Sequence, residues 1–216
     1  MIDFDDINSE NEITLKFFPT SRRKTSIFIF CGIPGTGKST YSKILQNKFV
    51  EGDCKIISRD ELRGNLLWEL RKEEQEEQSE KIKKLDKLVS KKVFEEISSA
   101  IEENKFSGII IDGCHTNWKT LAKLLQFVNK IENTIIHVLI VGNYVSETNW
   151  KISNKKEGDY SDYDDQFNHE KIPLEVLSRK RNEMRVLFSH YFQFMIPLID
   201  YVSVLPKRNK SSLIQK

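Results

Sequence analysis

The stretch Gly32-Ile33-Pro34-Gly35-Thr36-Gly37-Lys38-Ser39-Thr40 stands between an apolar run and a segment with helical spacing. Its pattern of Gly, four residues, then Gly-Lys-Ser is the P-loop signature of proteins that bind nucleotide phosphates. The run 27–31 before it predicts a buried strand, and Tyr41, Leu45 and Phe49 after it recur at helical intervals. Strand, loop and helix in this order are the context that the signature requires. The alternative, a tight turn with a capping serine, is the weaker interpretation.

The loop residues have predicted roles in binding a nucleotide. Glycines let backbone N–H groups approach phosphate oxygens, and the following helix directs its partly positive N-terminus at them. Lys38 would place its charge on the β- and γ-phosphates and act in catalysis, and the Ser39 hydroxyl would be a metal ligand for Mg²⁺. We therefore expect ATP or another nucleoside triphosphate, with Mg²⁺, as the cofactor. The predicted nucleotide-binding residues of the loop are Gly32, Pro34, Gly35, Thr36, Gly37, Lys38, Ser39 and Thr40.

Length and composition limit the class of protein. A chain of 216 residues suits one domain with an appended segment. Its 34 basic and 32 acidic residues nearly balance, so a general polyanion-binding surface is not indicated. The three cysteines lie in or beside apolar runs, which is typical of a reduced protein and not of a disulfide scaffold. No apolar stretch approaches the ~20 residues of a membrane span, and the acidic N-terminus is unlike a signal peptide, so we expect a cytoplasmic or intracellular protein with no membrane partner.

The rest of the chain alternates between predicted strands and helices. Besides 27–31, strands are expected at 54–58, 107–113, 134–141 and 201–205. Helices are expected after residue 58 or 60, over 70–104, through Leu121 to Val128, and from Pro173 onward. This alternation predicts an α/β fold of the P-loop NTPase type, with a parallel sheet of about five strands and helices on both faces.

Acidic residues follow two of the predicted strands. Asp60 and Arg63 share one helical face just after strand 54–58, at the edge where open α/β sheets bind ligands. The competing interpretation is a helix cap with a surface ion pair. Asp112 ends the strand 107–113, where it could orient the Mg²⁺ shell or a substrate, or serve only as a turn residue. His137, inside a strand, is interpreted as a core residue.

With these motifs the chain resembles the 5′-kinase domain of phage-type polynucleotide kinases, within the wider group of P-loop kinases. The resemblance rests on 32–40, on 58–63, on Ile111-Asp112 with Thr116-Asn117, and on the basic run 151–156 leading into 172–177. It covers residues 26 to about 190 in the family's order. It implies transfer of the γ-phosphate of ATP to a 5′-hydroxyl end of RNA or DNA, as in nucleic-acid end repair. The partner would be that nucleic-acid end.

The resemblance also assigns roles to single residues. Asp60 matches the aspartate that accepts the proton of the 5′-hydroxyl, and Arg63 matches the arginine that holds the phosphate beside the accepting nucleotide. Both would be catalytic. Asp112 and Asn117, with Arg63, fall at positions of the family's substrate-binding segments, although two extra residues separate Asp112 from Thr116-Asn117 here.

The resemblance further implies a helical lid at about 146–172, within a kinase domain at 26–206. Lys151 and Lys155 occupy the places where lid arginines clamp the ATP phosphates, so they are predicted nucleotide-binding residues. Lysine lacks the planar fork of arginine, so the clamp would be weaker or arranged differently. Residues 1–25 would be an N-terminal arm and linker, and 207–216 a basic tail. The Asp-x-Asp-Gly-Thr phosphatase signature does not occur in the sequence.

Two other functions stay open. A P-loop kinase with another acceptor, such as seryl-tRNA or a small metabolite, would share the loop. The pair Asp60/Arg63 and the basic helix at 179–185 favour a nucleic-acid end. A nucleotide-binding module without transfer activity would use ATP only to switch a partner. Nucleotide turnover with and without 5′-hydroxyl oligonucleotides distinguishes the three.

Overall fold

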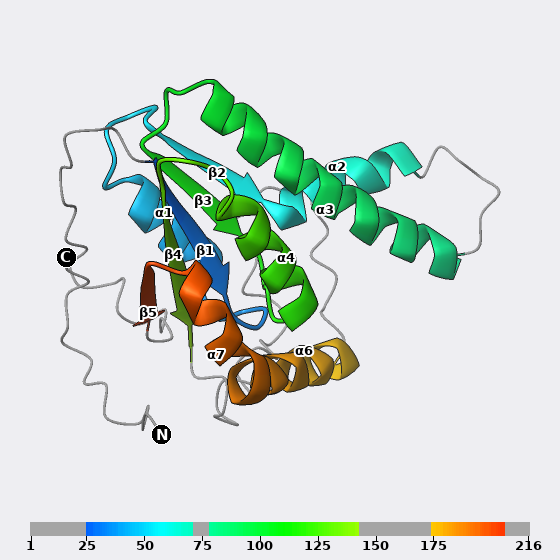
Figure 1. Cartoon of the computed structure of the whole chain (residues 1–216). Coiled ribbons are helices and arrows are strands. Elements are labelled where there is room, and N and C mark those ends of the chain that lie inside the picture. The colour runs from blue at the N-terminus through cyan, green and yellow to red at the C-terminus, as the bar shows by residue number, and fades with distance from the viewer. Residues whose placement is uncertain (1–24, 71–77, 143–173, 206–216) are drawn as a thin grey trace, which may run out of the picture.

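The chain forms one five-stranded parallel sheet (Figure 1). The computed structural model describes residues 25–70, 78–142 and 174–205. In the order β2-β3-β1-β4-β5, the strands are β2 (Cys54–Ser58), β3 (Gly108–Asp112), β1 (Thr25–Cys31), β4 (Thr134–Val141) and β5 (Tyr201–Leu205). Every neighbouring pair is parallel, which confirms the predicted fold class. The carboxyl ends of all five strands therefore lie at one edge of the sheet.

Helices cover both faces of the sheet, as the alternation predicted. On one face lies α1 (Lys38–Gln46). On the other lie α3 (Gln78–Glu102), α4 (Trp118–Val128), the π-helical turn η1 (Leu187–Tyr191) that continues α6 (Leu174–Val186), and α7 (Phe192–Met195). A 3₁₀ turn, η2 (Ile196–Leu198), leads from α7 to β5. The helix α2 (Arg59–Leu70) follows β2 and packs against α3 (Figure 1).

The central strand β1 explains why the sequence reads as a continuous apolar run. Ile27 and Ile29 face the cluster under α3 and α4, while Phe28 and Phe30 face the cluster under α1. All four are completely or almost completely buried. A parallel strand covered on both faces has no solvent side, so its sequence does not alternate between apolar and polar residues.

Two predicted helices differ in extent from the structure. The helix after the loop ends at Gln46, so Phe49 lies in the following turn. There its ring covers Gly108, where an added Cβ would stand 2.5 Å from Phe49 Cζ. Of the charged helix expected over 70–104, the structure shows α3 at 78–102, and residues 71–77 lie outside the described part of the chain.

Several predicted segments also lie outside the described residues. These are the arm before Thr25, the lid at about 146–172 with Lys151 and Lys155, and the tail 207–216. Their assignment as separate parts of the chain stays a prediction. Within the described residues, no helix is both long and apolar enough to cross a membrane.

His137 lies in the sheet as a packing residue, as predicted. Its ring is stacked between those of Phe28 and Tyr201, with centroid distances of 4.5 and 4.9 Å. Burial lowers its pKa to about 4, so the ring is neutral at pH 7. It is therefore a stacked aromatic member of the sheet.

The packing of α4 against the sheet predicts a large effect of truncation on stability. Leu125 is completely buried in the main cluster, whereas Lys123 on the same helix is exposed. Leu125→Ala should lower the free energy of unfolding by about 2–5 kcal/mol, because it leaves a cavity that the sheet cannot fill. Lys123→Ala is the matched control and should change it by less than about 0.5 kcal/mol. Urea unfolding of both variants measures the difference, and equal midpoints would contradict this account of the core.

Candidate active site

The loop between β1 and α1 adopts a conformation that depends on glycine. Gly35 and Gly37 have φ angles of 79° and 92°, in the left-handed region that other residues rarely adopt. Gly32 lies so close to β4 that an added Cβ would stand 2.7 Å from the carbonyl oxygen of Val141. The Gly32 amide donates to the Cys114 carbonyl oxygen at 2.9 Å. The loop is therefore fixed between the ends of β3 and β4.

Two side chains of the loop, those of Lys38 and Thr36, point inward. The Lys38 Nζ donates to the Ile33 carbonyl oxygen at 2.7 Å, and the Thr36 hydroxyl donates to the same oxygen at 2.9 Å. Lys38 is only 7% exposed although it is charged. The lysine amine is therefore held within the loop, where a bound phosphate chain would meet it.

The N-terminus of α1 carries no side-chain cap. Gly37 is the capping residue and makes no side-chain hydrogen bond. The first backbone N–H groups of a helix lack intrahelical partners, and the helix dipole adds partial positive charge there. An uncapped N-terminus behind a glycine-rich loop fits a phosphate group.

Asp112, at the end of β3, faces the loop. Its carboxylate accepts a hydrogen bond from Ser39 and is only 7% exposed. Burial raises the pKa of this carboxyl, and the nearby Asp60 carboxylate raises it further, whereas the Ser39 hydrogen bond and the Lys38 charge lower it. The sequence left Asp112 open between an active-site and a turn residue. Its contact with Ser39 favours the active-site role.

Asp60 lies at the start of α2, close enough to Asp112 to influence its titration. The Ser58 hydroxyl caps this helix by accepting from the Glu61 amide at 3.3 Å. Asp60 is exposed, and no hydrogen bond or ion pair joins its carboxylate to any other residue in the described part of the chain. The helix begins directly after residue 58, the first of the two expected positions, and Ser58 caps it. The Asp60 carboxylate is not required for the helix start.

Arg63 lies one turn further along α2 and forms an ion pair with Asp86 of α3. Both side chains are about half exposed. The predicted face shared by Asp60 and Arg63 therefore extends toward α3, where Arg63 contributes to helix packing. An exposed pair of this kind typically contributes at most about 1 kcal/mol to stability.

Asn117 caps the N-terminus of a helix in this fold. Its Oδ1 accepts from the amides of Lys119 and Thr120 and so caps α4. Its neighbour Thr116 is buried and donates to Glu183 of α6 at 2.7 Å, and Lys180 donates to the same carboxylate at 2.9 Å. The loop after β3 is thus fastened to both α4 and α6. Substrate binding by Asn117 stays a prediction.

Two residues near this edge were assigned no role from the sequence. Arg59 crosses Gly113, where an added Cβ would stand 2.7 Å from Arg59 Cδ. His115 is buried with a φ of 41°, and its Nδ1 lies 2.8 Å from the Phe30 carbonyl oxygen. Burial lowers the pKa of His115 to about 4, so its neutral ring donates from Nδ1. For Arg59, the signal in the sequence is its position next to Asp60. For His115, no local pattern in the sequence indicates its place in the structure.

These residues fit a nucleotide with Mg²⁺. The uncapped helix, the inward Lys38 and the glycine cradle suit the β- and γ-phosphates. The hydroxyl of Ser39 and the carboxylate of Asp112 already meet, and hydroxyl and carboxylate oxygens are the ligands that Mg²⁺ prefers. The geometry therefore brings together five predicted residues, Gly32, Lys38, Ser39, Asp60 and Asp112.

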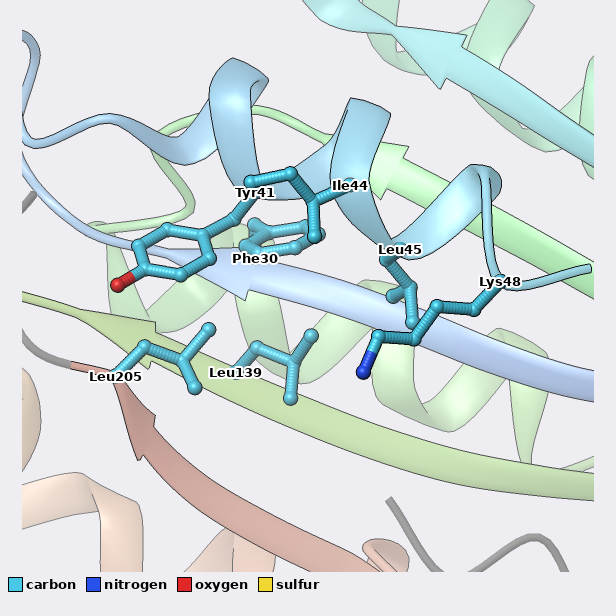
Figure 2. A pocket seen from close by; sticks show the side chains of 7 residues that line it. All are labelled: Phe30, Tyr41, Ile44, Leu45, Lys48, Leu139 and Leu205. Carbon is cyan, nitrogen blue, oxygen red and sulfur yellow. The ribbon is translucent and has the colours of Figure 1, made fainter. Parts of the chain in front are cut away.

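A separate apolar pocket of about 140 Å³ lies between α1 and the sheet (Figure 2). Its lining residues come from α1 and the turn after it, β1, β4 and β5, and are Phe30, Tyr41, Ile44, Leu45, Lys48, Leu139 and Leu205. It contains no carboxylate and none of the predicted site residues. It is therefore distinct from the phosphate-binding edge.

Comparison with known proteins identifies the family of the chain. A family model described as an AAA domain matches residues 31–166, which include the loop, Asp60, Arg63, Asp112 and Asn117. No protein of curated function matches the sequence.

Among solved structures, a chain of the Pnkp1/Rnl/Hen1 RNA repair complex is 16% identical with a TM-score of 0.51, over 80% of this chain and 48% of that one. A second structure of the Pnkp1/Rnl/Hen1 complex is 18% identical with a TM-score of 0.42, over 70% and 46%. This chain thus spans about half the length of those two relatives. A gluconokinase from Sinorhizobium meliloti 1021 is 10% identical with a TM-score of 0.47, over 89% of both chains.

The first of these similarities supports the fold alone, because identity is low. The family match covers more than half of the 216 residues and includes the phosphate-binding loop. Together with the parallel sheet and the loop geometry, it shows that the chain belongs to the AAA domain family and has the fold of a P-loop kinase.

Proposed function

We propose that this protein transfers the γ-phosphate of ATP to a 5′-hydroxyl end of RNA or DNA. The observation that carries the proposal is the position of Asp60. Its carboxylate is exposed, is not needed as a helix cap, and lies near Asp112, which in turn contacts Ser39 of the loop. A hydroxyl that attacks a phosphoryl group is assisted by a base within hydrogen-bond reach, and a carboxylate can serve as that base. A shared fold with a chain of an RNA repair complex is compatible with a nucleic-acid acceptor.

Each of these residues would have its own role in the transfer of the phosphoryl group. The loop amides and Lys38 hold the β- and γ-phosphates, and Ser39 with Asp112 would hold Mg²⁺. When bound, the metal supplies positive charge to the phosphate oxygens. The oxygen of the acceptor hydroxyl forms a bond to the γ-phosphorus, and the bond from that phosphorus to the ADP oxygen breaks. Asp60 accepts the proton that the hydroxyl loses. Arg63, by the resemblance, would contact the phosphate beside the accepting nucleotide.

A second candidate is a kinase for a small hydroxyl compound without a phosphate. It is favoured by the ion pair between Arg63 and Asp86, which already uses the guanidinium assigned to the acceptor phosphate. The loop, Asp60 and Asp112 would act in the same way on such an acceptor.

The test is ATP turnover with 5′-hydroxyl RNA, with 5′-hydroxyl DNA, with the same oligonucleotides already carrying a 5′-phosphate, and without acceptor. Turnover that depends on the 5′-hydroxyl end supports the proposal. Turnover only with small hydroxyl compounds selects the second candidate. ATP binding without turnover on any acceptor would indicate a nucleotide-binding module.

The predicted lid gives a further expected result. If Lys151 and Lys155 clamp the donor, Lys155→Ala should raise the KM for ATP several-fold with little change in the KM for the oligonucleotide. Lys155→Arg should keep or improve the clamp, because a guanidinium matches two phosphate oxygens at once. Steady-state kinetics with each substrate varied measures both effects. Wild-type kinetics for both Lys151→Ala and Lys155→Ala would remove the clamp from the proposed mechanism.

A further inference from the structure

His115 is a buried residue at the carboxyl edge of the sheet to which the mechanism above gives no role. It is 5% exposed and lies in the loop between β3 and α4, three residues after Asp112. Its φ of 41° is in the left-handed region, which residues other than glycine rarely adopt. Its Nε2 is buried and has no hydrogen-bond partner among the described residues. Both features cost stability, and strained residues of this kind cluster at active sites.

His115 holds the end of β1, the strand that leads into the phosphate-binding loop. Its Nδ1 donates to the Phe30 carbonyl oxygen at 2.8 Å, two residues before Gly32, where the loop begins. The carbonyl oxygen of the preceding residue, Cys114, accepts from the Gly32 amide at 2.9 Å. The paired register of β1 and β3 ends before this junction, so these two bonds hold it in place of the sheet ladder.

The next residue along the chain fastens the same segment to α6. Thr116 is buried, and its hydroxyl donates to the Glu183 carboxylate at 2.7 Å. Lys180 donates to the same carboxylate at 2.9 Å, which holds Glu183 in place. Thr116 and His115 are adjacent, so only two residues separate α6 from the end of β1. Because protein interiors are densely packed and transmit strain, a shift of this segment would reach the loop.

We propose that His115 is a positioning residue for ATP, which acts through the Phe30 carbonyl oxygen to hold the phosphate-binding loop in the conformation that accepts the phosphates. Thr116 sets the place of His115 by its bond to α6. His115 does not touch the nucleotide. Binding of the phosphates depends on loop amides that are already in position, so a displaced junction weakens it. The inference concerns the nucleotide alone and holds for any acceptor.

The experiment compares two replacements of His115 in the full chain by direct binding of MgATP. His115→Phe keeps a ring of similar size but removes the donor, so the buried Phe30 carbonyl oxygen loses its partner. It should raise the Kd for MgATP by about 10-fold or more. His115→Asn is smaller, but it keeps a donor near the position of Nδ1 and adopts positive φ readily. It should keep the Kd within about 3-fold of the wild-type value.

A residue that only filled space would give the opposite order, with Phe close to wild type and Asn impaired, and that order would overturn the inference. The matched control is His137→Phe, which replaces the other buried, neutral histidine of the sheet. It should leave the Kd for MgATP within about 2-fold of the wild-type value. The unfolding midpoint of each variant shows that the protein being titrated is folded.

The bond to α6 has a test of its own. Thr116→Val removes the hydroxyl and should raise the Kd for MgATP by about 3- to 10-fold. Thr134→Val is its control, because the Thr134 hydroxyl donates to the Ile131 carbonyl oxygen at 2.9 Å at the opposite edge of the sheet. It should bind MgATP as the wild type does. Equal affinities of the two valine variants would overturn the role of Thr116.

The combination of His115→Phe with Thr116→Val shows whether the two residues act through one connection. If they do, the double variant should bind MgATP no more than about 2-fold less tightly than His115→Phe alone. Fully multiplied effects would mean that Thr116 does not act through His115. If His115→Phe does not fold, the comparison of Thr116→Val with Thr134→Val decides.

The outcomes for this inference and for the proposed function can be told apart. MgATP binding without transfer to any 5′-hydroxyl end contradicts the proposed function and leaves this readout intact. Transfer to a 5′-hydroxyl end with an unchanged Kd in His115→Phe supports the function and overturns the role of His115. A wild type that does not bind MgATP would overturn both.

Discussion

Lys38→Ala is expected to abolish ATP turnover while the protein stays folded. Lys38 is the charged side chain that the loop holds inside itself, through its bond to the Ile33 carbonyl oxygen at 2.7 Å. Phosphoryl transfer depends almost entirely on positioning and on stabilising negative charge, so removing this amine should lower kcat by at least about 10²–10³-fold. Alanine is a strong helix former, so the start of α1 should be preserved.

Activity and stability must be measured on the same preparation. Lys43→Ala, an exposed position of α1, is the control and should keep turnover within about 2-fold, since surface substitutions rarely have larger effects. The unfolding midpoints of both variants should stay close to that of the wild type. A Lys38→Ala protein with near-native transfer would remove the phosphate-binding assignment of the loop, whatever its stability.

Asp60→Asn is expected to lower transfer to a 5′-hydroxyl end by at least about 10²-fold, because a positioned base typically contributes 10²–10⁴-fold. Asparagine keeps the size of the side chain but cannot accept the proton. The start of α2 should be unaffected, since Ser58 and not Asp60 caps it. ATP affinity should stay near the wild-type value, because Lys38, Ser39 and the loop amides are unchanged.

The matched control is Glu61→Gln, which removes the neighbouring exposed carboxylate on the same turn of α2. It should transfer at close to the wild-type rate. Single-turnover transfer from labelled ATP, together with nucleotide affinity, separates the possible roles. Wild-type transfer by Asp60→Asn would place the base elsewhere, and parallel loss of ATP binding and transfer would make the role of Asp60 structural.

Local sequence predicted most of the scaffold, for a physical reason. A buried parallel strand must be apolar on both faces, and β1, β3 and β4 are recognisable from that alone. The loop is recognisable because glycine is the residue that adopts the positive φ angles at 35 and 37 without steric cost. Helix ends were less accurate, as α1 shows. Its continuation as far as Phe49 looked regular, but that ring instead fills the space over Gly108 of β3.

The predicted lid and arm lie outside the described residues. The phosphate-clamping role of Lys151 and Lys155 therefore remains a prediction. For Asn117 the structure adds a role that the sequence reading did not assign. Asparagine is a favoured N-cap, and here its side chain accepts two amides of α4. A resemblance across a family preserves the position of such a residue but does not reveal which groups it contacts.

The sequence by itself determined the phosphate-binding loop, the strands that flank it and the parallel sheet, because each depends on residues near one another in the chain. Only the tertiary structure decided which groups the two arginines of α2, Arg59 and Arg63, contact. Strand β3 lies between β1 and β2, which places Asp112 and Gly113 beside both the loop and the start of α2. Arg63 meets Asp86, 23 residues away, and Arg59 crosses Gly113. No local pattern encodes such pairings, since they follow from the order of the strands and the packing of α2 on α3.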